Sequence, residues 1–249
     1  MSRTRTLDTP GTGAGTAPEF QVRPEMLDLV SPPGDRGGMI IGADRKANTP
    51  MTASILRPEP TRMVTVGGLY LARQIALRAI ATGAWVHIVT GRPAAWRVLE
   101  RAAGRTPAGQ PAPVVQTRKL APYDTPRATE DSPLLIVHDG GAVPQEMFPP
   151  RSAWQTTMYV LPYLHPQAGS GTATNTADLI LLQRLPPQQA QLAARFWYFD
   201  APQRQNLIQQ LTQIPDDGVI ALGDSLWMPL TLVTAPKERE ILGPIRRGD

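Results

Sequence analysis

Residues 62–103 read RMVTVGGLYLARQIALRAIATGAWVHIVTGRPAAWRVLERAA, and this stretch decides the fold. Two short apolar runs rich in β-branched residues, at 63–66 and 85–89, each end at a glycine-containing turn, and a segment with helical periodicity follows each turn. The first helical segment carries one continuous apolar stripe, formed by Leu71, Ala72, Ile75, Ala76, Ala79 and Ile80. Its other side is predicted to carry Arg73, Gln74 and Arg78. Strands that alternate with helices over short connections predict a parallel sheet flanked by helices.

The same pattern continues outward from this stretch. Further strands are predicted at 134–138, 157–161 and 178–183, short strands at 38–42, 51–56 and 114–117, and a hairpin at 218–222 and 227–233. Helices are predicted over 69–82, 94–103, 187–196 and 202–213. The strands before residue 57 and the hairpin are expected at the edges of the sheet. The sequence therefore predicts an α/β fold, built on one mostly parallel sheet.

The domain limits follow from composition. Residues 1–35 include a Thr/Gly/Ala/Pro stretch without periodicity, so a disordered or extended tail is predicted there. A single α/β domain is expected over 36–244, and a frayed end over 245–249. The 249 residues suffice for a sizeable core.

Composition also excludes several kinds of chemistry. The chain has no cysteine, which excludes disulfides, cysteine-ligated zinc, iron–sulfur clusters and thiol catalysis. Its three histidines are far apart in the sequence and leave little for a histidine-based metal site. No apolar run is long enough to span a bilayer, and the first residues lack the apolar core of a secretory signal. A cytoplasmic location is therefore expected.

Positive charge is concentrated in the middle of the chain. Residues 51–130 hold eleven basic and four acidic side chains, whereas residues 131–249 hold eight basic and eleven acidic ones. A basic region favours an acidic partner, although a solvated face explains it equally well. The candidate partner surface comprises Arg73, Arg78, Arg92, Arg97, Arg101 and Arg105, of which Arg97 and Arg101 are predicted to point outward from helix 94–103. Nucleic acid is the less favoured partner, because no nucleic-acid-binding motif accompanies these residues.

Two features resemble parts of a nucleotide-binding site. The turn at Gly67–Gly68 stands where a phosphate-binding loop would follow its strand, but the pattern GxxxxGK[ST] is not met, because Arg73 and Gln74 fall where its lysine and hydroxyl would be. The run LLIVHD at 134–139 ends in an acid, as a magnesium-binding strand does. The layout resembles motor ATPase domains of the FtsK kind with the catalytic residues replaced. We interpret the Gly67–Gly68 turn as a tight strand-to-helix connection, with a weakly nucleotide-binding module as the alternative.

The sequence contains none of the other catalytic motifs that we looked for. Neither GxSxG nor GxGxxG occurs, and no pair of carboxylates has the spacing of a general acid and base. His87 and His138 fall in or at the end of predicted buried strands and are interpreted as core residues. We predict that the chain is not an enzyme and needs no cofactor or metal.

One segment resembles a known family. The residues concerned are Gly42–Asp44, Thr49–Pro50, Val64–Val66, Gln74–Ala84, Val86–Pro93, Trp96 and Leu99. Together, within about residues 38–104, they resemble the cytoplasmic domain of EccE, a membrane-complex component of actinobacterial type VII (ESX) secretion systems. Members of that family carry transmembrane helices before this domain. The resemblance implies a structural subunit without catalysis that binds other subunits of the secretion complex or itself. It also implies a place in the cytoplasm, at the inner face of the membrane through those partners.

Overall fold

The computed structural model describes residues 38–120, 126–142, 152–167, 176–197, 200–223 and 227–245. The chain divides into residues 1–35 and 36–249, and all described residues belong to the second unit. The tail predicted over 1–35 and nearly all of the frayed end predicted over 245–249 lie outside the described residues.

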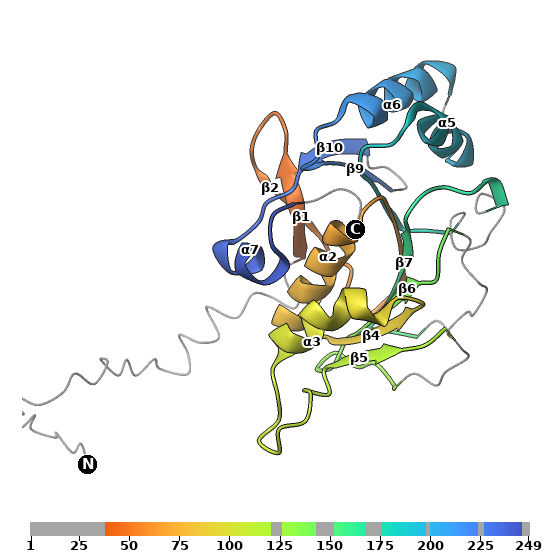
Figure 1. Cartoon of the computed structure of the whole chain (residues 1–249). Coiled ribbons are helices and arrows are strands. Elements are labelled where there is room, and N and C mark those ends of the chain that lie inside the picture. The colour runs from red at the N-terminus through yellow and green to blue at the C-terminus, as the bar shows by residue number, and fades with distance from the viewer. Residues whose placement is uncertain are drawn as a thin grey trace, which may run out of the picture. The chain divides into compact units, whose positions relative to one another are not determined.

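Ten strands form one mixed sheet in the described part of the chain (Figure 1). They are β1 (Met39–Asp44), β2 (Pro50–Ala53), β3 (Thr61–Val66), β4 (Trp85–Thr90), β5 (Val115–Arg118), β6 (Leu134–Asp139), β7 (Gln155–Leu161), β8 (Leu179–Leu182), β9 (Gly218–Leu222) and β10 (Trp227–Thr231). Their order is β2-β1-β10-β9-β8-β3-β7-β6-β4-β5. The six strands from β8 to β5 are parallel, and the other four pair antiparallel. The predicted α/β fold with a mostly parallel sheet is confirmed.

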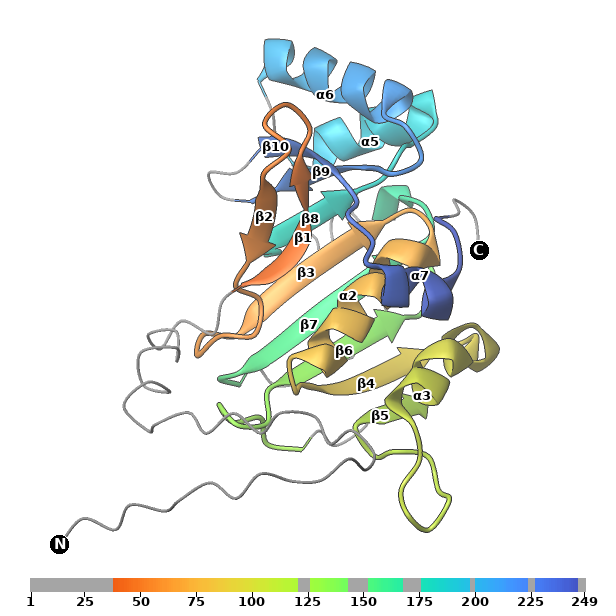
Figure 2. The ribbon, with the colours of Figure 1, turned by 90° about the vertical axis from the view of Figure 1, so that its left-hand side faces the viewer.

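Helices cover both faces of this sheet. They are α2 (Leu69–Ala81), the 3₁₀ turn η1 (Pro93–Trp96), α3 (Arg97–Ala103), α5 (Pro187–Phe196), α6 (Ala201–Gln213) and α7 (Pro236–Leu242). Figure 2 looks onto the face that carries α2, α3 and α7. Met63 of β3 packs in the core beneath α2, whereas its neighbours Val64 and Val66 pack in a second core with α5 and α6. Successive strand residues face opposite sides of the sheet, and helices cover both sides. The central strands therefore carry apolar residues on both faces and appear in the sequence as continuous apolar runs.

The predicted stripe of α2 is buried as expected. Five of its six members are at most 2% exposed, and Ile80 is half-buried. The helix ends at Ala81 with Thr82 as its C-cap, and Gly83 follows with φ of +90°, a conformation that favours glycine. Gln74 was predicted on the outer side, but it is buried. The reason is that two parts of the chain, the segment that follows β10 and the helix α7, pack on this side of α2. Helix α2 therefore has two buried sides rather than one.

Two other predictions need correction, and one helix was not predicted. The predicted helix 94–103 begins as the 3₁₀ turn η1 and becomes α-helical at Arg97. The β9–β10 hairpin is not at the edge of the sheet, because β1 pairs with β10 and β2 pairs with β1 beyond it. Helix α7 was not predicted. None of its residues is fully buried, so its seven residues carry no apolar stripe that would give a periodic signal.

Candidate functional site

The carboxyl ends of parallel strands are the usual ligand-binding edge of an open α/β sheet. Both nucleotide-like features of the sequence lie at this edge, Gly67–Gly68 after β3 and Asp139 at the end of β6. What each residue touches there decides whether the edge is open to a ligand.

The Gly67–Gly68 turn is closely packed. Gly67 has φ of +132°, and its N–H donates to the Leu161 carbonyl at 2.9 Å, which continues the pairing of β3 with β7. The side chain of Gln183, just after β8, fills the space above Gly67: a Cβ there would lie 2.6 Å from Gln183 Oε1. The first helical residues, Leu69 and Tyr70, are 1% exposed. The contacts therefore support a tight strand-to-helix connection, with a side chain and a sheet hydrogen bond where a phosphate would need open space and a free N–H.

The Asp139 carboxylate is enclosed by donors from the end of β4 and from η1. It accepts hydrogen bonds from Thr90 Oγ1 at 2.8 Å and from Trp96 Nε1 at 2.8 Å, both at Oδ2. Arg92 adds Nε at 2.9 Å from Oδ2 and Nη2 at 2.9 Å from Oδ1. The Asp139 side chain is 1% exposed. Both oxygens are thus occupied by protein donors, and the acid joins β6 to the β4–η1 turn.

The six candidate arginines do not form one surface. Arg97, Arg101 and Arg105 are exposed, as the prediction for the first two required, while Trp96 and Leu99 take the buried side. Arg105 donates to the Gly109 carbonyl at 2.7 Å. The three make no ion pair with any residue in the described ranges.

The remaining three arginines differ in their burial and in the ion pairs that they form within the fold. Arg92 binds Asp139, and Arg78 binds Glu238 with its side chain only 15% exposed. Arg73 is half-buried on α2. Arg78 and Arg92 are therefore corrected from surface contacts to internal ones. A single helix pattern does not show this, because their partners come from α7 and β6.

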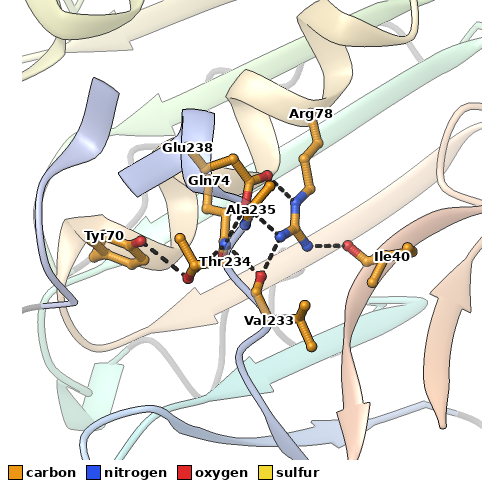
Figure 3. Close-up of polar contacts among 8 residues, drawn as sticks. All are labelled: Ile40, Tyr70, Gln74, Arg78, Val233, Thr234, Ala235 and Glu238. Atoms are coloured by element: carbon orange, nitrogen blue, oxygen red, sulfur yellow. Dashed lines mark hydrogen bonds and ion pairs between the residues drawn. The ribbon is translucent and has the colours of Figure 1, made fainter. Parts of the chain in front are cut away.

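A polar cluster joins α2 to Glu238 of α7 and to the segment before this helix (Figure 3). Arg78 Nε lies 2.5 Å from Glu238 Oε1, and Arg78 Nη2 lies 2.8 Å from Glu238 Oε2. Gln74 Nε2 donates to Glu238 Oε2 at 3.0 Å and to the Val233 carbonyl at 2.9 Å. Arg78 also donates to the carbonyls of Ile40 and Val233, so one guanidinium links α2, β1 and the segment before α7.

Glu238 also starts α7. Its Oε2 accepts the Ala235 N–H at 3.0 Å, and Pro236 occupies the first helical position. Burial alone would raise the pKa of Glu238, but hydrogen bonds from Arg78, the Ala235 N–H and Gln74 outweigh burial and hold this pKa below its usual value. Sequence reasoning missed this residue, although a proline followed two positions later by a glutamate is a recognised signal of a helix start.

His87 and His138 lie in the core, as predicted. Burial lowers the pKa of each to about 4, and the charge of Arg118 adds to this effect at His87. His138 stacks on Tyr159, with ring centroids 5.1 Å apart. Neither ring nitrogen of His87 has a hydrogen-bond partner among the described residues, so His87 is a core histidine whose polar atoms are not satisfied there. Within the described ranges, no three acidic or histidine side chains are grouped to hold a metal ion.

Comparisons with known proteins add little. No family model matches the chain, and no curated protein matches it. Among solved structures, the chain is similar to the genome packaging NTPase B204 of Sulfolobus turreted icosahedral virus 2, solved with AMP. The two are 11% identical with a TM-score of 0.43, over 71% of this chain and 99% of the other. This likeness is too distant to support a function. In the described part of the chain, every helix is too short or too polar to cross a membrane.

Proposed function

We propose that this chain is a non-catalytic interaction subunit of a larger protein assembly. The observation that carries the proposal is the state of Asp139. The acid that stands where a nucleotide-binding fold would bind magnesium receives hydrogen bonds from Thr90, Arg92 and Trp96 and is withdrawn from solvent. A magnesium ion would have to displace these donors. The filled turn at Gly67 supports the same conclusion.

The docking surface we propose is the exposed face of α3 with the residue beyond it, formed by Arg97, Arg101 and Arg105. Arg97 and Arg101 stand one helical turn apart, which places both on the same side of the helix. The charges of Arg97 and Arg101 are not neutralised by described residues, so an acidic partner surface gains attraction there without displacing an internal contact. The partner is another subunit of the assembly or a second copy of this chain.

The assembly we propose is a type VII secretion apparatus. Support comes from the resemblance of residues 38–104 to the cytoplasmic domain of EccE. Several residues that carry the resemblance form the core of the fold: Val64 and Ile75 are at most 2% exposed, as are Trp96 and Leu99. In this proposal the chain acts in the cytoplasm, at the inner face of the membrane through its partner subunits.

Nucleotide binding separates the proposal from its main alternative. The chain is heated with and without ATP and magnesium, and binding is measured in parallel by calorimetry. A nucleotide at about a hundred times its Kd would add about 2.7 kcal/mol and raise the melting temperature by several degrees. We expect no such shift. Stabilisation that disappears in Arg73→Ala would contradict the proposal and favour a nucleotide-binding module.

A further inference from the structure

A groove lies between the turn that joins β1 to β2 and the carboxyl end of α6. It encloses about 440 Å³, within the range of about 300–1,000 Å³ that is usual for ligand sites. Its lining residues are Arg45, Lys46, Gln210, Gln213, Ile214 and Pro229. We propose that this groove binds an acidic, extended peptide segment of a partner protein. The site is separate from α3 and goes beyond the function proposed above.

The turn presents its two cations from a well-ordered backbone. The Asp44 carboxylate accepts the N–H of Lys46 at 2.7 Å and of Ala47 at 2.6 Å, and the Asp44 N–H donates to the Thr49 carbonyl at 2.9 Å. These backbone N–H groups, that of Ala47 first, lower the pKa of Asp44. The Arg45 N–H donates to the Pro229 carbonyl at 3.4 Å, which joins the turn to β10. The backbone at Arg45 and Lys46 is therefore held in place beside the groove.

Neither of these two cations forms an ion pair with a described acid. Both side chains are exposed. Asp44 attracts the charge of Lys46, but its carboxylate is directed to the backbone N–H groups of Lys46 and Ala47. Asp216, two residues beyond Ile214, binds Arg184 at 2.5 Å. The groove thus keeps two positive charges on one wall, which favours an anionic ligand.

The opposite wall indicates which kind of anion fits. Gln213 is exposed and forms no hydrogen bond with described residues, so its amide offers both a donor and an acceptor. Gln210 Oε1 is shielded from solvent and lacks a donor there. A peptide backbone supplies N–H and C=O groups to such amides. The lining contains no aromatic ring on which a nucleic-acid base could stack, and the volume is larger than a single phosphate needs.

The test measures binding of fluorescein-labelled hexaglutamate by anisotropy, with labelled hexaglutamine as the uncharged peptide. Inorganic phosphate and an oligothymidylate serve as unlabelled competitors. The variants are Arg45→Glu with Lys46→Glu, Gln213→Ala, and Lys119→Glu with Arg127→Glu, a control of equal charge change at exposed residues that lie outside both the groove and α3. Hydrogen exchange of the wild type with and without hexaglutamate locates the bound peptide. Thermal melts establish that each variant is folded.

We expect hexaglutamate to bind and hexaglutamine to bind at least about tenfold more weakly. Reversal of Arg45 and Lys46 should weaken hexaglutamate binding about tenfold or more, whereas reversal of Lys119 and Arg127 should change it less than about threefold. Exchange should slow at 44–50 and 210–214. The inference is overturned if the wild type does not bind, if both double variants lose equal affinity, or if phosphate or the oligothymidylate competes better than unlabelled hexaglutamate. None of these outcomes bears on α3, whose role is tested separately.

Discussion

Arg92 binds Asp139 through two nitrogens, with Nε 2.9 Å from Oδ2 and Nη2 2.9 Å from Oδ1. The two residues stand at the carboxyl ends of neighbouring parallel strands, because Thr90 of β4 pairs with Asp139 of β6. This edge of an α/β sheet commonly binds ligands. Here an ion pair and two further hydrogen bonds occupy its acid, so the edge stabilises the fold.

Replacing Asp139 tests this stabilising role. Asp139→Ala removes the acceptor of Thr90, Trp96 and Arg92 at once, and should lower the free energy of unfolding by about 2–4 kcal/mol. The Arg92 side chain is 37% exposed, so water compensates part of its loss. Asp139→Asn, which keeps one acceptor oxygen, should cost less. Urea denaturation measures both, with the exposed Glu59→Gln as control. A loss below about 0.5 kcal/mol for Asp139→Ala would contradict the assignment.

Helix α7 offers a matched pair of glutamates. Glu238→Ala should lower the free energy of unfolding by about 2–3 kcal/mol, because it leaves the half-buried Arg78 without its carboxylate and removes the acceptor of the Ala235 N–H. Glu240→Ala removes only an exposed pair with Lys237 and should cost about 0–0.5 kcal/mol. Urea denaturation and hydrogen exchange of α7 measure the difference. Equal effects of the two changes would show that the cluster in Figure 3 does not hold α7.

The buried histidines predict how stability depends on pH. The pKa values of His87 and His138 each fall from 6.5 to about 4 on folding. The unfolded chain therefore binds more protons between these values, and stability is lost as the pH falls through this window. From pH 7 to pH 5 each histidine should remove about 2 kcal/mol. His87→Leu should remove about half of the combined histidine-dependent slope, whereas His165→Gln serves as the control. Denaturation at several pH values measures this, and an unchanged slope in His87→Leu would contradict it.

Two glycines with positive φ allow the stability cost of backbone strain to be distinguished from the cost of a steric clash. Gly67→Ala adds a Cβ 2.6 Å from Gln183 Oε1, whereas Gly83→Ala adds one with no atom within 4 Å. Strain alone should cost about 1 kcal/mol at Gly83, and strain with the clash should cost about 2–4 kcal/mol at Gly67. Gln183→Ala combined with Gly67→Ala should recover part of this loss. Equal stability of the two alanine variants would show that Gln183 does not fill the turn.

Sequence patterns reveal local elements better than the contacts between them. The stripe of α2 and the apolar runs of β3, β4 and β6 are visible because periodicity is a local property. The pairing of β1 with β10 joins segments nearly 190 residues apart, and nothing local indicates it. The same limit applies to the site. Asp139 stood out as an acid that ends a strand, but its partners Arg92 and Trp96 lie more than forty residues earlier and meet it only because β4 and β6 are neighbours.

The function we propose for this chain is binding of a protein partner through α3. The most direct measurement is co-purification of tagged chain with its native assembly from the source cells, followed across a salt series, for the wild type and for Arg97→Glu with Arg101→Glu. Both arginines are exposed and unpaired among described residues, so the melting temperature should stay near that of the wild type. We expect the double variant to lose most of the bound subunits and the remaining binding to be less sensitive to salt. Full retention of the partners by the folded double variant at every salt concentration would contradict this proposal.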